Sequence, residues 1–275
     1  MTSIFMVIGI VGWIALLTSI YVYKKAKDER LKSITIDDKE STDPNVVVIG
    51  GGTGQSVFLR GLKNRTRNIT AIVTVADDGG GSGVLREDLG MLPPGDIRNC
   101  LLALANIEPT MKEVMQYRFT EGALKGQSFG NLFLAAMNGL YGNFEVALYK
   151  MSQIFAITGK VLPVTLNDIN LIAKLKNGKI VKGESRIPKE VKDDKTYIER
   201  VYLDEQDAVP LDEVINSIEN ADIIIMGPGS LYTSIIPNLL VNGVVDAIEK
   251  SKAPKVYICN IMTQPGETDD HNVLD

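Results

Sequence analysis

The chain of 275 residues carries a formal net charge of −5, a pI of about 5.1 and 45% hydrophobic residues. This composition supports one large domain or two small ones, and the acidic balance argues against a nucleic-acid partner, which would bind a basic face. With His271 as its single histidine, the chain nearly excludes histidine triads and histidine-rich metal sites. Cys100 and Cys259 lie among apolar residues, so we expect two reduced core thiols of a cytosolic domain rather than a disulfide.

The first predicted element is an uncharged stretch of 20 residues, 4–23, long enough to cross a bilayer core of roughly 30 Å. Five lysines and arginines follow it between positions 24 and 32, so the positive-inside rule places the rest of the chain in the cytoplasm. A buried core helix is the alternative interpretation. We expect a single-pass protein of the cell membrane, with a transmembrane anchor at 1–25, a charged tether at 26–44 and a cytoplasmic domain at 45–275.

After the tether, segments typical of strands alternate with segments of helical spacing. Strands are expected at residues 46–49, 69–75, 221–226 and 255–260, and the first and third of them have the pattern of buried strands. Helices are expected at residues 55–63, 96–105, 111–119, 130–140, 143–155, 211–220 and within 235–250. Asp96 is expected to cap the second of these helices, after a long glycine-rich connection at 77–95. The alternation predicts a Rossmann-like α/β fold, with a mostly parallel sheet and helices on both faces.

Residues 160–203 differ from this pattern, because they alternate or are rich in β-forming residues. Asn177-Gly178 is typical of a hairpin turn. We therefore expect a small inserted antiparallel β element, with strands at 160–164, 169–176, 179–186 and 197–203.

The first strand runs into the glycine turn at residues 50–54, GGGTG, and a helix follows at once. Backbone N–H groups of such a turn can approach an anion, and the helix N-terminus favours negative charge. The dinucleotide fingerprint GxGxxG does not fit, because Gln55 or Val57 takes its third glycine position. No GK[ST] follows, so a Walker P-loop does not fit either. A tight turn without a ligand is the alternative.

Polar residues also follow the second strand and open the next helix. Asp77 and Asp78 would suit Mg²⁺ or sugar hydroxyls, Asp77 could instead hold a ribose, and a solvated turn is the alternative. Arg98 and Asn99 lie in the first turn of a helix, where an arginine is poorly matched to the helix dipole. A charged partner nearby would account for the arginine, and a surface salt bridge is the simpler explanation.

Three further loops carry candidate ligand contacts. Ser128 and Asn131 precede an apolar helix. They either cap this helix or use their hydroxyl and amide groups to bind a nucleobase or a ribose. The second glycine turn at 227–230, with the hydroxyls that follow it, could hold a second phosphate, so the two turns together suit a diphosphate. The loop TQPGETD would close the pocket, with Glu267 as an acid–base or sugar-binding group or as an exposed charge.

In this order, the motifs GGGTG, DDGGGSG, LPPGDIRNCL, SFGN, NDINL, GPGSLYTSIIPNLL and TQPGETD resemble the YvcK-type family of bacterial gluconeogenesis factors. That family is similar to the CofD-like 2-phospho-L-lactate transferases, and the resemblance spans residues 45–275. It departs from the family in two ways. The hydrophobic anchor is not a general family feature, and relatives continue for some tens of residues, so we expect the domain to be C-terminally incomplete.

The resemblance implies a Rossmann-like domain that binds UDP-N-acetylglucosamine or another UDP-sugar, with Mg²⁺ as a further candidate ligand. It implies a regulatory role in cell shape and cell-wall synthesis during gluconeogenic growth. The expected partners are the membrane, wall-synthesis proteins or a kinase, and a second copy of the chain. The residues expected to contact ligand are Gly51, Gly52, Thr53, Gly54, Asp77, Asp78, Arg98, Asn99, Ser128, Asn131, Gly227, Gly229, Ser230, Tyr232, Thr263 and Glu267, with Asp77 and Asp78 as metal ligands.

Two other functions remain open at this stage. The first is a Mg²⁺-dependent transferase that moves a phospholactyl-type group from a nucleoside diphosphate donor. Donor binding and transfer need the same groups, but transfer also needs an acceptor held in line, and no acceptor pocket or catalytic residue is identifiable. The second is a NAD-dependent oxidoreductase, which the broken fingerprint disfavours. We therefore favour a non-catalytic nucleotide-sugar binder.

Overall fold

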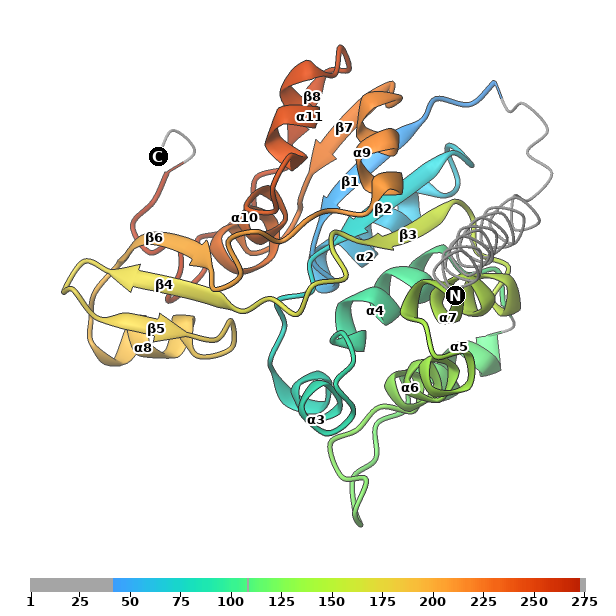
Figure 1. The fold of residues 1–275 in the computed structure, drawn as a ribbon, viewed down its shortest axis with the longest axis horizontal. Coiled ribbons are helices and arrows are strands. Elements are labelled where there is room, and N and C mark those ends of the chain that lie inside the picture. The colour runs from blue at the N-terminus through green and yellow to red at the C-terminus, as the bar shows by residue number, and fades with distance from the viewer. Residues whose placement is uncertain (1–41, 108, 273–275) are drawn as a thin grey trace, which may run out of the picture. The chain divides into compact units, whose positions relative to one another are not determined.

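The computed structural model describes residues 42–107 and 109–272 (Figure 1). The compact unit Asp43–Asp275 is built on a five-stranded sheet in the order β3-β2-β1-β7-β8, in which every neighbouring pair is parallel. Its strands are β1 (Val46–Gly50), β2 (Ile69–Val73), β3 (Lys160–Pro163), β7 (Ile223–Met226) and β8 (Lys255–Tyr257). The predicted α/β fold with a mostly parallel sheet is confirmed.

The expected membrane anchor at 1–25 lies outside the described residues. Among the residues that the structure does describe, no single helix has the length and apolar character to span a bilayer. One pair of helical segments, Leu231–Leu239 and Val244–Lys250, meets those two criteria jointly, with a bend of 77° between its halves.

The central strand β1 is buried along its whole length, as its run of β-branched residues predicts. Val46 pairs with Ile69 of β2 on one side and with Ile223 of β7 on the other. Because the strands are parallel, the loops after β1, β2, β7 and β8 lie at the same edge of the sheet. This edge is where the candidate residues gather.

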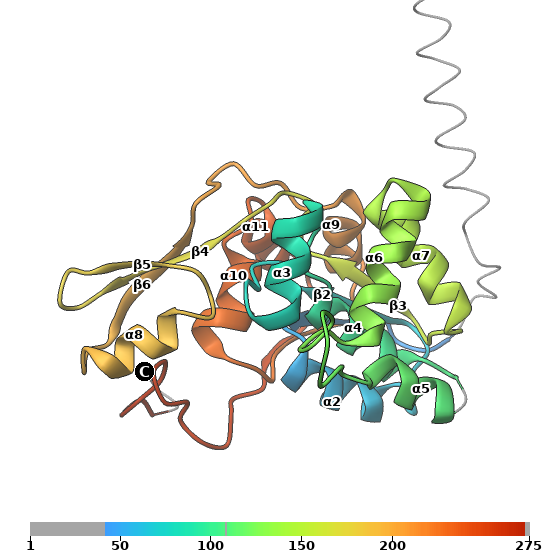
Figure 2. The ribbon, with the colours of Figure 1, turned by 90° about the horizontal axis from the view of Figure 1, so that it is seen from below.

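Helices cover both faces of the parallel sheet (Figures 1 and 2). One face carries α2 (Thr53–Leu62), α4 (Pro94–Leu104), α5 (Pro109–Gln116), α6 (Phe129–Tyr141) and α7 (Phe144–Ile154). The other carries α9 (Asp212–Glu219) and α11 (Val244–Lys250). The change of face accompanies the reversal of strand order at β1, as right-handed crossovers require.

The inserted antiparallel element is a three-stranded sheet in the order β5-β4-β6, with a short helix between β5 and β6 in the chain that contacts β4 and β5. Its elements are β4 (Leu171–Leu175), β5 (Ile180–Lys182), α8 (Ile187–Asp193) and β6 (Ile198–Leu203). The predicted hairpin turn is confirmed, because Gly178 has a φ of 88° and the Asn177 side chain accepts the Lys179 N–H at 3.0 Å. The strand expected at 179–186 is shorter, and it gives way to α8.

One predicted strand was assigned to the wrong sheet. The segment at 160–164 forms β3, the edge strand of the parallel sheet, where Val161 pairs with Ala71 of β2. A local pattern of β-forming residues cannot show which strand will be the partner, so the sequence alone did not separate β3 from the insert that follows it.

The glycine-rich connection expected at 77–95 also differs, because it contains helix α3 (Gly80–Leu89). Glycine weakens a helix, but here the neighbouring backbone leaves no room for a side chain. A Cβ on Gly83 would lie 2.2 Å from the carbonyl oxygen of Asp78. Close packing therefore outweighs the helix propensity of this segment.

Three smaller expectations were wrong. Asp96 does not cap α4, because it lies in the first turn of that helix after the N-cap residue Pro93. The helix expected within 235–250 is broken into η1 (Leu231–Ile235), α10 (Ile236–Leu239) and α11. Cys100 is buried as expected, but Cys259 is exposed, because it follows β8, an edge strand that is itself exposed along its length.

Candidate ligand-binding site

The two predicted glycine turns converge at the carboxyl edge of the parallel sheet. A Cβ on Gly54 would lie 2.5 Å from the carbonyl oxygen of Pro228, so the turn after β1 touches the turn after β7. A Cβ on Gly52 would lie 2.5 Å from Cα of Asp96, which brings the start of α4 to the same place. These glycines are thus required for contact between loops, since any side chain would force the loops apart.

The loops enclose a cavity of about 340 Å³. Seven of the residues predicted from the sequence line it: Gly51, Gly52, Thr53, Gly54, Asp77, Gly229 and Ser230. Six others also line it, and of these the sequence had suggested only the Thr233 hydroxyl as a contact: Thr74, Asp96, Glu184, Thr233, Ser234 and Asn260. A cavity of this size lies within the range of small-molecule sites.

The first glycine turn presents main-chain donors to this cavity. The N-cap residue of α2, Gly52, has no side chain to cap the helix, so the N–H groups of the first turn have no partner within it. The Gly52 N–H itself donates to the Asp96 carboxylate, which lies at this end of the helix. Gln55, which broke the dinucleotide fingerprint, is buried beneath the turn and donates to the carbonyl oxygens of Val48 (2.8 Å) and Ile72 (3.3 Å). Its amide therefore ties β1 to β2 and fixes the turn from below.

The second glycine turn is arranged differently, because a carboxylate of the chain occupies the start of η1. Glu267 accepts hydrogen bonds from the Thr233 hydroxyl (2.9 Å) and the Tyr232 N–H (3.2 Å). It is 3% exposed, and burial raises its pKa. Glu267 is thus a buried structural group rather than part of the cavity wall. Gly227, Tyr232 and Thr263 do not line the cavity either.

Three carboxyl groups face the cavity, and among the residues that the structure describes no lysine or arginine lines it. Burial raises the pKa of Asp96 to about 6, with a further contribution from the charge of Asp77. The pKa of Glu184 rises to about 8, through burial first and then through the charges of Asp77 and Asp96. Burial also raises the pKa of Asp77. An anion in this cavity therefore needs either protonated carboxyls or a cation beside it.

The pair expected to bind a metal, Asp77 and Asp78, does not face the cavity together. Asp77 lines it and accepts the Gly79 N–H at 2.8 Å. Asp78 instead accepts the Ser185 N–H at 2.8 Å, which holds the loop after β5. In the described part of the chain, no group of three His, Cys, Asp or Glu side chains has the arrangement of a metal site. Asp96 and Glu184 are the carboxylates that could join Asp77 in holding a cation.

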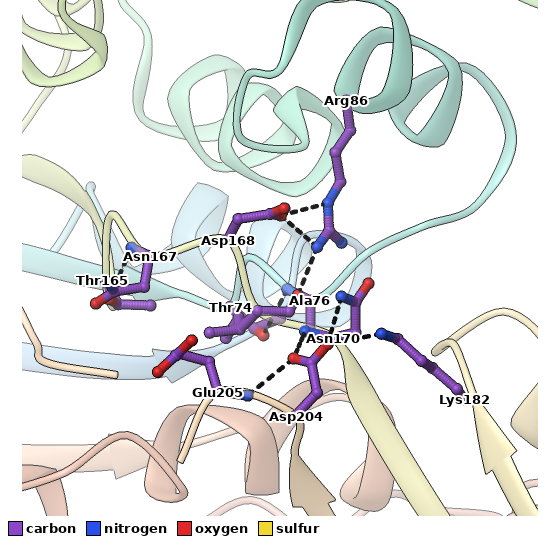
Figure 3. Close-up of polar contacts among 11 residues, drawn as sticks. Thr74, Ala76, Arg86, Thr165, Asn167, Asp168, Asn170, Lys182, Asp204 and Glu205 are labelled. Atoms are coloured by element: carbon purple, nitrogen blue, oxygen red, sulfur yellow. Dashed lines mark hydrogen bonds and ion pairs between the residues drawn. The ribbon is translucent and has the colours of Figure 1, made fainter. Parts of the chain in front are cut away.

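Glu184 reaches the cavity from the inserted sheet, and a polar joint attaches that sheet to α3 (Figure 3). Arg86 of α3 donates to the Asp168 carboxylate (2.8 Å from Nε) and to the Ile169 carbonyl oxygen (2.8 Å). Asp204, at the end of β6, accepts the Asn170 N–H at 2.7 Å and pairs with Lys182 at 2.8 Å. The NDINL motif therefore serves the joint rather than a ligand.

Three more predicted residues, Arg98, Asn99 and Asn131, line a second hollow of about 180 Å³ that shares Asp77 and Asp96 with the cavity, whereas Ser128 lies behind Arg98 and does not line it. Arg98 donates to Asn131 Oδ1 (2.8 Å), to Asn99 Oδ1 (2.7 Å) and to Ser128 Oγ. Ser128 caps α6 by accepting the Asn131 N–H at 3.3 Å, so the capping role suggested by the sequence is confirmed. Arg98 is 8% exposed, which excludes a surface salt bridge.

Some of the missed residues carried a signal in the sequence, and others did not. Asn260 is a polar residue at the carboxyl end of the last predicted strand, the position at which ligand contacts gather. Its amide donates to the Gly229 carbonyl oxygen at 2.9 Å. Glu184 carried no such signal, because it lies in the insert and reaches the site only through the tertiary fold.

A parallel sheet whose order reverses at β1, with a cavity at its carboxyl edge, defines a Rossmann-like α/β protein. The chain belongs to the CofD family: the family profile described as 2-phospho-L-lactate transferase CofD matches residues 46–275. This result confirms the family that the sequence motifs indicated.

Individual relatives agree with this assignment. A protein of Thermoanaerobacterium thermosulfurigenes is 71% identical over 225 residues, covering 82% of this chain and 70% of its own. The protein named gluconeogenesis factor in Bacillus subtilis is 51% identical over 233 residues, covering 84% of this chain and 72% of its own. A relative in Clostridium acetobutylicum is 60% identical over 232 residues, 84% of this chain, but the chain spans only 51% of that protein.

A solved structure shows the same fold. The crystal structure of a UPF0052 family member from Bacillus halodurans superposes with a TM-score of 0.81 at 51% identity. The match covers 84% of this chain and 74% of that one.

Proposed function

We propose that this protein is a regulatory protein of the gluconeogenesis-factor type that binds a UDP-sugar, such as UDP-N-acetylglucosamine, at the carboxyl edge of its parallel sheet. The observation that carries this proposal is the contact between the two glycine turns, which places the first turn of α2 at a cavity of about 340 Å³, with Asp96 accepting the Gly52 N–H beside it. A helix N-terminus with free N–H groups favours a phosphate.

We further propose that the protein is held at the cell membrane by residues 1–25, faces the cytoplasm and acts in cell morphogenesis during gluconeogenic growth. The uncharged stretch at 4–23, followed by lysines and arginines, supports the anchor. The names of the relatives support the link to gluconeogenesis. Wall-synthesis proteins or a kinase are the proposed partners, and a homo-oligomer is the proposed assembly.

Calorimetric titration of the full chain with UDP-N-acetylglucosamine, UDP, GDP and NAD tests the ligand class. We expect saturable binding of the two uridine compounds and much weaker binding of GDP and NAD. Tight NAD binding without UDP binding would overturn the proposal. A Ser234→Trp variant, which fills the cavity beside Gly51, serves as the negative control for site-specific binding.

A second function, a Mg²⁺-dependent transferase, is favoured by the family description and by the three carboxyl groups at the cavity. A cation held by Asp77 with Asp96 or Glu184 would neutralise a diphosphate donor. In that reaction the acceptor hydroxyl loses a proton and bonds to the distal phosphorus, the P–O–P bond breaks, and the nucleoside monophosphate leaves. Phosphorus NMR of the protein with lactyl diphosphoguanosine, a deazaflavin alcohol and Mg²⁺ would detect the monophosphate. Its absence, together with UDP-sugar binding, would favour the regulatory function.

A further inference from the structure

The second hollow contains a buried arginine whose charge has only neutral hydrogen-bond partners among the described residues. The guanidinium of Arg98 donates to the side-chain oxygens of Ser128, Asn131 and Asn99. Its Nε is buried and has no partner. The charge of Asp96 partly offsets the cost of burying Arg98, although the burial of the guanidinium still lowers its pKa. A further anion at the hollow would reduce that cost.

The same contacts turn two amides into donors toward a ligand. Asn99 and Asn131 both direct their oxygens to Arg98, so their NH₂ groups remain free to donate. In the described structure those NH₂ groups have no acceptor, and both residues line the hollow. The two amides that contact Arg98 therefore present donating atoms to the hollow, whose accepting side chains are the carboxylates of Asp77 and Asp96 at its boundary with the cavity.

Main-chain donors line another part of the hollow. Helix α3 begins without a side-chain cap at Gly79, and its first internal bond runs from Gly83 N–H to the Gly79 carbonyl. The N–H groups of Gly80, Gly81 and Ser82 thus precede the helical ladder, and all three residues line the hollow. An uncapped helix start beside an unpaired guanidinium is a favourable environment for an anion.

A second guanidinium reaches the same place. Arg118 lines the hollow from the exposed segment after α5, and its charge, after burial, lowers the pKa of Arg98. Two positive charges that repel each other across one hollow would both gain from an anion between them.

We propose that this hollow is an anion-binding subsite that takes a phosphate or carboxylate group next to the nucleotide cavity. The inference rests on the proposed function only for the identity of the neighbouring ligand. Asp77 and Asp96 line both spaces, so they form the boundary between the nucleotide and the anion. Their oxygens accept the N–H groups of Gly79 and Gly52, so each carboxylate is held at this boundary by a main-chain donor. The anion is either a separate molecule or an acidic group on the sugar of the nucleotide.

Orthophosphate titration by calorimetry, on the full chain with and without saturating UDP, tests the subsite. We expect phosphate to bind in both conditions, and Arg118→Gln to weaken its binding about tenfold, the loss expected for one charge-assisted contact. Arg60→Gln removes the same charge from an exposed position on α2 and is the matched control, with phosphate affinity unchanged. Equal thermal unfolding midpoints of the two variants would show that Arg118→Gln is folded.

A second arm separates the two sources of the anion. If the group belongs to the sugar, UDP-glucuronate binds more tightly than UDP-glucose, and Arg118→Gln removes that preference. If the anion is a separate molecule, the two nucleotides bind with equal affinity, and Arg118→Gln weakens the binding of orthophosphate instead.

The outcomes also separate this inference from the proposed function. Phosphate binding that UDP abolishes and Arg118→Gln leaves unchanged would place phosphate in the nucleotide cavity and overturn the subsite. Failure of wild type to bind orthophosphate, combined with equal affinity for UDP-glucuronate and UDP-glucose, would overturn it as well. Loss of phosphate binding in Arg118→Gln, in a protein that does not bind UDP, would support the subsite and reject the proposed nucleotide.

Discussion

The hydroxyl of Thr233 donates to Oε1 of Glu267 at 2.9 Å, while Thr233 itself lines the ligand cavity. Glu267 lies behind it and also accepts the Tyr232 N–H, so a buried carboxylate holds the start of η1 in place. The wall of the cavity therefore depends on a residue that no ligand needs to touch.

Replacing Thr233 by valine removes this donor with little change in shape. The buried Glu267 then loses one of its partners, and we expect the free energy of unfolding to fall by about 1–3 kcal/mol. Urea denaturation measures the change. Thr233→Ser keeps the hydroxyl and is the control, and its stability should lie closer to wild type. Equal stability of the valine variant and wild type would contradict the role assigned to Glu267.

Two glycines of the same helix should respond in opposite ways to alanine. Gly54→Ala places a Cβ about 2.5 Å from the Pro228 carbonyl, so we expect a loss of roughly 1–3 kcal/mol and weaker UDP binding. Gly61 lies in α2 with nothing within 4 Å of its Cβ position. Gly61→Ala should therefore stabilise the protein by roughly 0.5–1 kcal/mol and leave UDP affinity unchanged. Thermal unfolding and calorimetry check both variants.

The raised pKa of Glu184 predicts the sign of a pH effect on stability. The pKa rises from 4.5 to about 8 on folding, so its favourable contribution is complete below pH 4.5 and is lost as pH rises through about 8. Glu184→Gln removes this loss. We expect its unfolding midpoint to exceed that of wild type at pH 9 by at least roughly 2–4 °C, and the difference to shrink toward pH 5. A constant difference across this range would contradict the assignment.

The same carboxyl groups predict how UDP affinity depends on pH. In EDTA, affinity should fall from pH 6 to pH 9, because Asp96 and then Glu184 become charged beside the diphosphate. In Mg²⁺ the trend should reverse, since ionised carboxylates hold the cation that offsets the phosphate charge. Calorimetry at each pH measures both series. Parallel trends in EDTA and Mg²⁺ would exclude a metal bridge at these residues.

The joint between α3 and the insert should contribute more to the free energy of unfolding than an ordinary ion pair on the surface does. The Arg86 side chain is 9% exposed, and Asp168→Ala removes its carboxylate partner, so we expect a loss of about 1–2 kcal/mol. Glu213→Ala breaks the exposed pair with Lys160 and is the control, with an expected loss below about 1 kcal/mol. Equal losses in urea denaturation would show that the joint is only a surface contact.

The sequence predicted the features that depend on local chemistry. The buried run before Gly50 specified β1, and Asn177-Gly178 specified the hairpin of the insert, because one strand pattern and one turn type fit each segment. The convergence of the two glycine turns followed from the rule that parallel strands end at one edge. These arguments needed no information about packing.

The features that were missed depend on tertiary contact. Helix α3 forms in a glycine-rich segment because Gly83 must lie against Asp78, which no propensity shows. Glu184 reaches the cavity only once the insert is docked. Glu267 looked like a ligand contact from the sequence, and it is instead buried against Thr233. The acidic character of the cavity, which sets the pH effects above, was therefore only partly visible.

The insert leaves the parallel sheet after β3, returns before β7, and contributes no strand to it. The main-chain donors of the first turn and the acidic wall at Glu184 therefore belong to stretches of chain that can change independently. Substitutions in the insert change the side chains that surround a bound ligand, while β1 and the glycine turn after it remain unchanged. Such a modular construction lets the fold acquire a new ligand specificity while the main-chain donors of the first glycine turn are kept.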